Sequence, residues 1–506
     1  MDIKTTDLVS LFEKSLQQVP QKELDEIGFV VQIGDTFCKI HGLKNAVYGE
    51  LIEFEHGNKG IIMNLEEDVV SVFLLQAQIP VIELEMAKRT GGVFKTPVGS
   101  ALLGRVINAI GEPLDALGEL QISQHQPIEV DIPSIIKRSP INEPLETGKL
   151  VIDSLVPIGK GQRELIIGNR VTGKTSLALS TVLHQKGKNV ICIYVSIGQR
   201  QANLARIVRM LEEQGSMSYI VIVSADASQP ALDRYLAPYV GCTIAEYFRD
   251  QKKDVLIIYD TLSNHADAYR EMSLLMRRSP GREAYPGDIF YLHSRLLERA
   301  GKFLAGGTIT ALPIVQIQSD DITAYIPTNL ISITDGQIFL DTKLFNQGMR
   351  PAVNVELSVS RVGGAAQTNA CKQMIRSLRL ELAQYHELAG FAQFGTELDQ
   401  VSQKHLARGE RVYRLLKQGE YANYSFVDQA MMLFLLQENF LDTIDLENIR
   451  PFATEFASYI QAVYGALYNE IYATADVTKE QRIQLREIAQ EFSKLYIPSH
   501  NGILQK

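Results

Sequence analysis

One glycine-rich turn, at residues 163–176, constrains the fold of this chain more than any other part of its sequence. Within it, Gly168 and Gly173 are separated by four residues and followed by Lys174 and Thr175, which is the spacing of a phosphate-binding P-loop. Glycines let backbone N–H groups point at phosphate oxygens, the lysine reaches the β- and γ-phosphates, and the threonine hydroxyl holds Mg²⁺. The pattern predicts a nucleoside triphosphate site. Its expected residues are Gly168, Asn169, Arg170, Val171, Thr172, Gly173, Lys174, Thr175 and Ser176.

The surroundings of this turn predict a strand before it and a helix after it. Residues 165–167 are apolar, as in a short buried strand, and residues 176–179 begin a helical pattern. Further apolar runs alternate with helical patterns, as in a mostly parallel sheet covered on both faces. The sequence therefore predicts an α/β nucleotide-binding domain over residues 89–367. Its other expected strands are residues 189–195, 219–223 and 254–260.

Asp260 ends the last of these apolar runs. Ligands of parallel sheets lie beyond the carboxyl ends of the strands, so this carboxylate is expected close to the P-loop. A single Asp after a strand is more often a turn residue, but the upstream P-loop favours a metal ligand. We therefore expect Asp260 to hold Mg²⁺, directly or through water, together with Thr175.

Differently patterned regions flank this domain. Residues 23–88 contain five or six short strands separated by tight turns, which predicts a small closed β-barrel. Residues 368–506 carry long amphipathic patterns, which predict a helical bundle. Residues 1–22 contain an amphipathic helix at 6–19, which either docks on a partner or packs on its own domain. The predicted fold class is therefore multidomain, with an N-terminal β-barrel, a central α/β P-loop domain and a C-terminal α-helical bundle.

Charge and composition restrict the partners. The 506 residues carry a formal net charge of −9, which argues against a nucleic-acid-binding surface. No apolar run approaches the roughly 20 residues that span a bilayer, and the N-terminus shows no signal-peptide pattern. We therefore expect membrane association only through partner proteins. The cysteines form no close pair and are expected to be buried thiols in a reducing compartment. They are Cys38, Cys192, Cys242 and Cys371.

Longer stretches carry a more specific signal than the P-loop alone. Residues 358–367 read SVSRVGGAAQ, and residues 280–288 read PGREAYPGD. With the P-loop region, they closely resemble the alpha subunits of rotary F-type ATP synthases over almost the whole chain. The other matching stretches are residues 97–99, 102–106, 157–168, 290–299, 327–329 and 332–338.

The resemblance implies a fold, an assembly and a location. It implies a β-barrel, a RecA-like nucleotide domain and a helical domain within an ion-translocating ATP synthase. Three alpha and three beta subunits would alternate in a ring around the gamma rotor subunit. The N-terminal helix would dock on delta or other peripheral-stalk subunits. The implied cofactors are ATP or ADP and Mg²⁺. The implied location is peripheral, on the cytoplasmic face of the bacterial plasma membrane, with an organellar equivalent left open.

Gln199 predicts that this subunit is not itself catalytic. It follows the strand that ends at Val195, where the resemblance to the catalytic beta subunit places a glutamate that orients the attacking water. An amide cannot accept a proton at neutral pH, although a glutamine orients water in some GTPases. We therefore expect Mg-ATP binding, with Gln199 in the site, and little intrinsic activity.

Arg361 is expected to act at a neighbouring site. By the resemblance, the arginine of this stretch reaches across the interface to the nucleotide of a beta subunit as an arginine finger, and Ser358 supports it. An arginine alone is most often part of a surface ion pair, but the matched surroundings favour the catalytic role.

The resemblance also assigns the contacts to the adenine base. It places Arg350, Pro351 and Gln418 around the base, and Glu420 at a second polar position that is usually glutamine. The chain also differs from the usual alpha-subunit residues at Asn169, Val171 and Thr261. Such departures bear on nucleotide affinity.

Three other functions compete with this interpretation. A self-sufficient hexameric ATPase of the flagellar-export type is disfavoured by Gln199 and by residues 358–367. A RecA-like or Rho-like nucleic-acid motor is disfavoured by the acidic balance. A purely structural ring member that has lost its nucleotide is distinguished only by a binding measurement.

Overall fold

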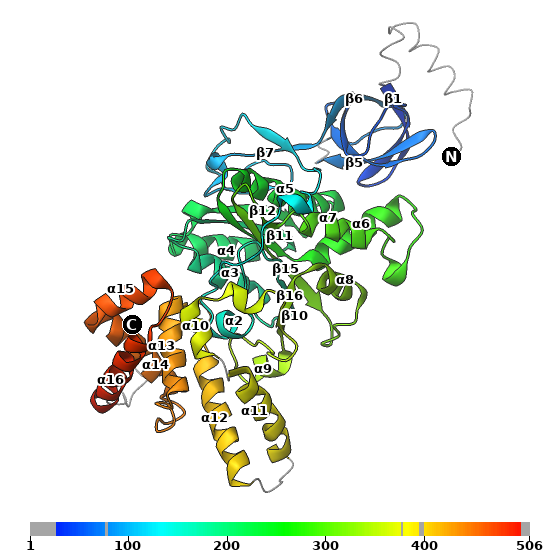
Figure 1. Cartoon of the computed structure of the whole chain (residues 1–506). Coiled ribbons are helices and arrows are strands. Elements are labelled where there is room, and N and C mark those ends of the chain that lie inside the picture. The colour runs from blue at the N-terminus through cyan, green and yellow to red at the C-terminus, as the bar shows by residue number, and fades with distance from the viewer. Residues whose placement is uncertain (1–26, 76–78, 376–377, 394–398, 497–506) are drawn as a thin grey trace.

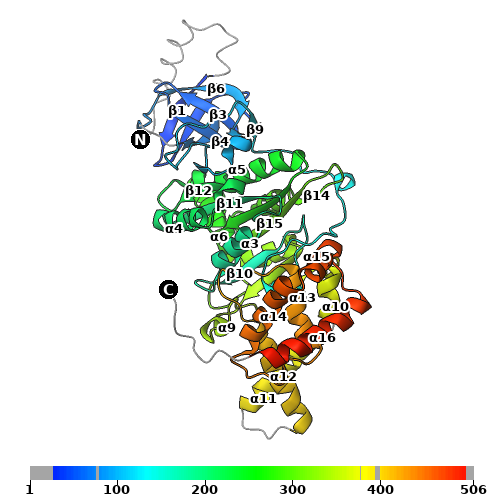
Figure 2. The same cartoon turned by 90° about the vertical axis from the view of Figure 1, so that its left-hand side faces the viewer.

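The computed structural model describes residues 27–75, 79–375, 378–393 and 399–496 (Figure 1). The chain forms a β-barrel, then an α/β domain, then a helical domain, so the expected fold class is confirmed. Figures 1 and 2 show the barrel at one end and the helical domain at the other, with the α/β domain between them. The helix expected at residues 6–19 lies outside the described residues.

The barrel is closed by six antiparallel strands in the order β1-β2-β5-β4-β3-β6. In β3, Ile52 and Phe54 are buried while Glu53 is exposed, which is the alternation of strands with one face in a core. The sixth strand crosses the domain boundary expected at residue 88. The strands are β1 Ile27–Ile33, β2 Phe37–Gly42, β3 Glu50–Phe54, β4 Lys59–Leu65, β5 Val69–Leu75 and β6 Met86–Val93.

The central sheet contains nine strands in the described residues, in the order β17-β16-β10-β15-β13-β11-β12-β8, with β14 paired to β15. The strands from β16 to β8 along this order run parallel, whereas β17 at the edge and β14 pair antiparallel. A two-stranded ribbon, β7 Lys95–Pro97 with β9 His125–Pro127, joins the sheet region to the barrel. The sheet strands are β8 Val106–Asn108, β10 Leu165–Asn169, β11 Val190–Gln199, β12 Ile220–Asp226, β13 Asp254–Asp260, β14 Gly301–Lys302, β15 Thr308–Ile317, β16 Gly336–Leu340 and β17 Val359–Ser360.

Helices cover both faces of this sheet, which explains its apolar strands. Alternate residues of β11 belong to different cores: Tyr194 belongs to the core that contains Leu177 and Val182 of α3, whereas Val195 belongs to the core that contains Leu236 of α5. The P-loop is therefore held between a buried strand and a buried helix. The helices of this domain are α2 Leu150–Leu155, α3 Lys174–His184, α4 Gln201–Glu213, α5 Ala231–Asp250, α6 Leu262–Leu275, α7 Ile289–Leu297, α8 Tyr325–Ile333 and α9 Thr342–Asn346.

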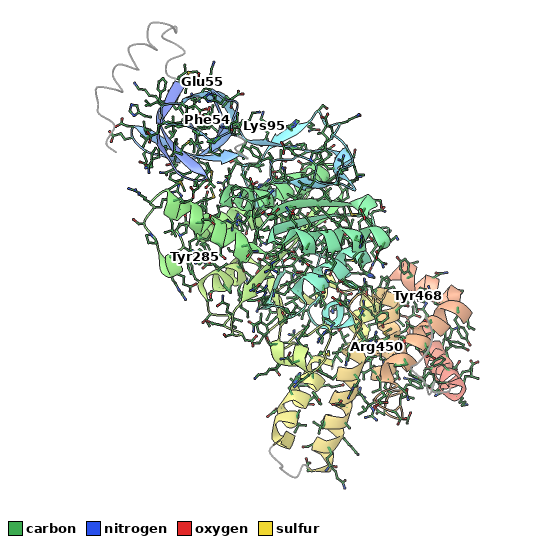
Figure 3. All side chains as sticks on the ribbon, turned by 180° about the vertical axis from the view of Figure 1, so that it is seen from behind. Phe54, Glu55, Lys95, Tyr285, Arg450 and Tyr468 are labelled. Atoms are coloured by element: carbon green, nitrogen blue, oxygen red, sulfur yellow. The ribbon has the colours of Figure 1, made fainter. Side chains whose placement is uncertain are left out.

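The helical domain shares one hydrophobic core with the α3 side of the sheet. Ser425 caps α13 in a reciprocal box with Asp428, and α11 and α12 form a hairpin that projects from the body (Figures 1 and 2). Arg450 and Tyr468 of this domain lie at the opposite end of the molecule from Phe54 of the barrel (Figure 3). The helices are α10 Asn369–Met374, α11 Leu378–Gln393, α12 Gln400–Leu416, α13 Phe426–Gln437, α14 Ile449–Val463, α15 Gly465–Thr474 and α16 Lys479–Leu495.

Two expectations drawn from composition can be compared with the described residues. None of the helices there combines the length and apolarity needed to cross a bilayer. The four cysteines are buried free thiols, as their spacing predicts.

Candidate functional site

A cavity of about 830 Å³ lies beside the P-loop, at the carboxyl ends of β10, β11 and β13. This is where α/β sheets bind their ligands. Basic side chains outnumber acidic ones along its wall, which suits a polyphosphate. The expected site residues that line it are Arg170, Val171, Thr172, Gly173, Lys174, Thr175, Ser176, Gln199, Asp260, Arg350, Pro351 and Glu420.

The P-loop turns sharply between the end of β10 and the start of α3. Gly173 has a φ of 93°, in the left-handed region that favours glycine, and α3 begins directly after it. A Cβ at Gly168 would lie 2.7 Å from the Leu340 carbonyl oxygen. Both glycines of the motif are therefore required by the backbone, and the N-terminus of α3 points its free N–H groups toward the cavity.

Lys174 lies along the inside of this turn. Its Nζ donates to the carbonyl oxygens of Gly168, at 3.0 Å, and Asn169, at 2.5 Å. Burial lowers the pKa of Lys174 to about 8, and the nearby Asp260 carboxylate opposes that shift. Gly168 and Asn169 therefore shape the turn without lining the cavity, and the ammonium is the group positioned to exchange these carbonyls for phosphate oxygens.

Thr175 and Asp260 come together as expected for a cation site. The Thr175 hydroxyl donates to Asp260 Oδ2 at 2.7 Å, and the Tyr194 hydroxyl donates to the same oxygen at 2.8 Å. Burial raises the pKa of Asp260. The described residues contain no cluster of three or more His, Cys, Asp or Glu side chains that could hold a metal. One hydroxyl and one carboxylate, completed by phosphate oxygens and water, fit Mg²⁺.

Gln199 lies at the end of β11, on the cavity wall near Asp260. Its Oε1 accepts a hydrogen bond from Asn203 at 2.7 Å. Its Nε2 lies 3.4 Å from both the Tyr194 hydroxyl and the Asp260 carbonyl oxygen. The amide is thus held in place on the cavity wall beside Asp260.

Gln418, expected at the base, lies behind the cavity wall. Its Nε2 donates to the Gly148 carbonyl oxygen at 2.7 Å, and its Oε1 accepts from the Leu150 N–H at 3.0 Å. Because both polar atoms of the Gln418 amide are hydrogen-bonded to the backbone, the side chain holds residues 148–150 in place. Arg350 does line the cavity, and its guanidinium lies 3.4 Å from the centroid of the Phe345 ring.

Lys149 is a functional-site residue that the sequence patterns did not reveal. It is 2% exposed, lines the cavity, and donates to the carbonyl oxygens of Gly419, Glu420 and Ala422 at 3.0, 2.8 and 2.9 Å. The only available signal was a lysine directly before an apolar helical run. Other lining residues outside the predicted set are Leu177, Gly198, Arg200, Asn203, Ala227, Thr261, Asn264, Gln316, Phe345 and Gly419.

Arg361 and Ser358 lie away from this cavity, next to the edge strand β17. The Arg361 side chain is exposed, and its N–H donates to the Asp335 carbonyl oxygen at 2.8 Å. The Ser358 hydroxyl donates to the Asn354 carbonyl oxygen at 2.6 Å and accepts from the Phe339 N–H at 2.9 Å. Ser358 therefore supports the backbone of this edge, and Arg361 faces outward from it.

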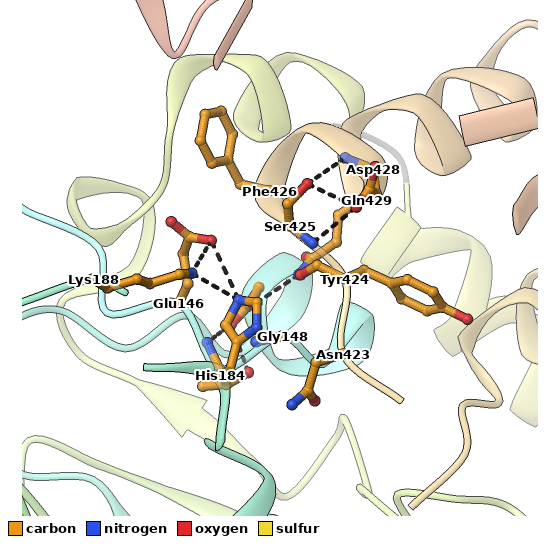
Figure 4. A network of polar contacts seen from close by, with 12 residues as sticks. Glu146, Gly148, His184, Lys188, Asn423, Tyr424, Ser425, Phe426, Asp428 and Gln429 are labelled. Carbon is orange, nitrogen blue, oxygen red and sulfur yellow. Dashed lines mark hydrogen bonds and ion pairs between the residues drawn. The ribbon is translucent and has the colours of Figure 1, made fainter. Parts of the chain in front are cut away.

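The far end of α3 is tied to the helical domain by a polar network (Figure 4). Glu146 accepts from Lys188 at 2.7 Å and lies 3.4 Å from His184 Nε2. Next to it, the Tyr424 N–H donates to the Gly148 carbonyl oxygen at 3.1 Å. The Ser180 hydroxyl of α3 also donates to Asn423 Oδ1 at 2.7 Å. Because α3 begins at the P-loop, the same helix contacts both the cavity and the segment that precedes α13 in the helical domain.

Replacing Glu146 by glutamine should lower the free energy of unfolding by about 2 kcal/mol at pH 7. Burial alone would raise the pKa of Glu146, but the His184 hydrogen bond and the Lys188 charge lower it to about 2, from an ordinary 4.5. A carboxylate whose pKa is lowered in the folded state stabilises that state at pH values above its unfolded pKa. This stabilisation is lost as the pH falls through the folded pKa of about 2. Urea unfolding at pH 7 and pH 3 should show the difference from the unsubstituted chain shrinking at the lower pH. The exposed Glu447, changed to glutamine, is the control, and an equal loss at both pH values would contradict the prediction.

A parallel sheet with a P-loop, a strand-end carboxylate and a cavity between them defines a P-loop nucleotide-binding protein. Its particular family follows from sequence comparison. The chain belongs to the ATP synthase alpha/beta family. Models of this family match its beta-barrel domain at residues 24–77, its nucleotide-binding domain at residues 148–360 and its C-terminal domain at residues 367–492.

Curated relatives extend this match over nearly the whole chain. ATP synthase subunit alpha of Acetivibrio thermocellus is 50% identical over 502 residues, covering 98% of this chain and 99% of the relative. The subunit of the same name from Clostridium botulinum strain Eklund 17B is 51% identical with the same coverage. That of Aquifex aeolicus is 49% identical over 95% of this chain and 96% of the relative. The resemblance to alpha subunits is confirmed, and a self-sufficient ATPase of the flagellar-export type is not favoured.

Proposed function

We propose that this chain is a non-catalytic, Mg-ATP-binding alpha subunit in the ring of an ATP synthase that couples ion flow to ATP synthesis or hydrolysis. One observation carries this proposal. Lys174, Thr175 and Asp260 lie together at the cavity, as a phosphate and cation set would, and Gln199 lines the same cavity where, by the resemblance, a catalytic beta subunit has glutamate. The site has the groups that bind a nucleotide and lacks the group that activates water.

Each side chain has a defined task in this proposal. Lys174 leaves the P-loop carbonyls and pairs with the β- and γ-phosphates, beside the N–H groups at the start of α3. Thr175 and Asp260 would hold Mg²⁺, which supplies charge neutralisation for the phosphates when bound. Gln199 can hold a water molecule but cannot take its proton. The nucleotide would therefore remain bound and intact.

Arg361 would act at a site that belongs to a neighbouring subunit. Its side chain is exposed and lies outside this chain's own cavity, and it directly follows strand β17, which is held by backbone hydrogen bonds. A planar, permanently charged group suits the charge that develops on a transferring phosphoryl group. Ser358 contributes by fixing the backbone of the segment that precedes Arg361.

The assembly follows from the same proposal. Beta subunits would alternate with this chain in a ring of three plus three around the gamma rotor subunit. Delta and peripheral-stalk subunits would hold the region of residues 1–22. The chain would meet the membrane only through the complex, on the cytoplasmic face of the bacterial plasma membrane or its organellar equivalent. No nucleic acid takes part.

The isolated full-length chain should bind Mg-ATP and hydrolyse it negligibly. The reason is the pairing of an intact phosphate site with Gln199 in place of an acid. Calorimetric titration measures the dissociation constant for Mg-ATP, and release of inorganic phosphate at saturating ATP measures the turnover rate. Rapid turnover would favour a self-sufficient ATPase, and no binding at millimolar ATP would favour a purely structural ring member.

A further inference from the structure

One wall of the cavity is built from residues outside the P-loop and the sheet. It contains Phe345, Arg350, Pro351, Gly419 and Glu420. The Arg350 guanidinium packs 3.4 Å from the Phe345 ring centroid, so planar and apolar surfaces lie together here. With phosphates at the P-loop, this wall is the part of the cavity suited to a nucleobase.

Glu420 presents a carboxylate on this wall. The Ser176 hydroxyl donates to its Oε1, which ties it to the first turn of α3. Burial and the Glu420 charge both raise the pKa of the adjacent Tyr421 hydroxyl. An ionised carboxylate only accepts hydrogen bonds, whereas an amide both donates and accepts. The base wall thus carries an acceptor with no N–H of its own.

Lys149 fixes the segment that carries this carboxylate. Its buried ammonium donates to three carbonyl oxygens, those of Gly419, Glu420 and Ala422. Gln418 adds a hydrogen bond from its Nε2 to the Ala422 carbonyl oxygen at 2.5 Å. The backbone on both sides of Glu420 is therefore fixed, and the Ser176 hydroxyl bond holds the exposed carboxylate at a defined place on this wall.

The two purines offer different edges to such a group. Guanine presents N1–H and its N2 amino group side by side, as two donors, and O6 as an acceptor. Adenine presents its N6 amino group beside the N1 lone pair. A carboxylate can accept hydrogen bonds from both guanine donors. Facing adenine, it would place one of its own lone pairs against the N1 lone pair, which is repulsive. An amide suits adenine, since it accepts from N6 and donates to N1.

We propose that this chain's own site binds guanine nucleoside triphosphates at least as tightly as adenine ones, and that Glu420 is the residue that recognises the base. The inference rests on the proposed function, because it takes the cavity to be a nucleotide site. Arg350 supports it as the donor on the same wall. Among the described residues, hydrogen bonds engage only its Nη1, with the Phe345 and Met349 carbonyl oxygens, so other N–H groups are available to O6.

Calorimetric titration of the full-length chain with Mg-ATP and with Mg-GTP tests this proposal. The measured quantity is the ratio of the two dissociation constants, because repulsion between Glu420 and the phosphates affects both nucleotides and cancels. The chain should bind Mg-GTP as tightly as Mg-ATP, within threefold, or more tightly. Glu420→Gln should shift the ratio about tenfold toward ATP, since charge-assisted hydrogen bonds are roughly twice as strong as neutral ones. Glu447→Gln, on an exposed glutamate, should leave it unchanged.

The outcomes separate this inference from the proposed function. Binding of Mg-ATP with Mg-GTP more than threefold weaker would overturn the guanine proposal and leave the nucleotide site standing. A ratio that moves less than threefold in Glu420→Gln would remove Glu420 from base recognition. If neither nucleotide binds, the proposed function itself fails.

Discussion

Replacing Arg361 by alanine should lower multisite ATP turnover of the reconstituted ring by about 10³- to 10⁵-fold. Such a loss is about 4 to 7 kcal/mol of barrier, the usual contribution of an arginine finger. Negative charge spreads over the transferring phosphoryl oxygens in the transition state, and the guanidinium stabilises it without moving a proton. The effect should fall on turnover far more than on nucleotide binding.

The structure shows why Arg361 can serve another subunit. The Asp335 carbonyl oxygen accepts from the Arg361 N–H at 2.8 Å. The Asp335 carboxylate is in turn held by Arg163, through Nε at 3.0 Å and Nη2 at 2.8 Å. Within the described part of the chain, the Arg361 guanidinium itself has no hydrogen bond or ion pair, although its charge opposes the rise that burial causes in the pKa of Glu164. The backbone is thus anchored while the charged end remains available.

Two variants control this measurement. Arg361→Lys should recover little activity, because an ammonium lacks the planar fork of the guanidinium. Arg209→Ala, on an exposed arginine of α4, should leave turnover near normal. Near-normal turnover of the Arg361→Ala ring, together with abolished turnover on loss of Lys174, would reverse the assignment of this chain as the non-catalytic partner.

The central strands were predictable from the sequence because they are buried on both faces. The run at residues 254–260 coincides with β13, and the run at 189–195 overlaps β11 from that strand's first residue, Val190. The prediction of five or six barrel strands did not locate the sixth, β6. It contains Gly91 and Gly92 and is mostly exposed or half-buried, so no alternation marks it. Its pairing with β1 and β3, far apart in sequence, defines it as a strand.

The site was predictable to the extent that it is local in sequence. The P-loop residues lie next to one another, so their spacing encodes their geometry. The base wall depends on contacts between distant segments, such as Lys149 with the carbonyl oxygen of Glu420. Whether the Gln418 amide faces a ligand or the backbone is likewise decided by Gly148 and Leu150, which no local pattern links to it.

Replacing Lys174 by methionine should weaken Mg-ATP binding to the isolated chain by about 10²- to 10³-fold, or about 3 to 4 kcal/mol. The variant keeps an apolar stem of similar length but removes the charge that pairs with the phosphates. In the ring it should harm turnover less than Arg361→Ala, because it affects only this chain's own site. Lys186→Met, on an exposed lysine that donates to the Gln214 carbonyl oxygen at 2.7 Å, is the matched control. An affinity loss of less than tenfold would remove Lys174 from phosphate binding.

The pH dependence of binding tests the same lysine independently. Burial lowers the pKa of Lys174 to about 8, so the free chain loses this ammonium as the pH rises above that value. Phosphate binding needs the charged form, so affinity for Mg-ATP should fall about tenfold between pH 8 and pH 9.5. Burial, and then the Arg450 charge, also lower the pKa of Lys149 to about 8. The Lys174→Met variant separates the two lysines, since it retains Lys149. If the affinity of the Lys174→Met variant for Mg-ATP does not change with pH, the loss of affinity at high pH is assigned to Lys174. If the variant still loses affinity at high pH, that loss is assigned to Lys149 and to the base wall that it supports.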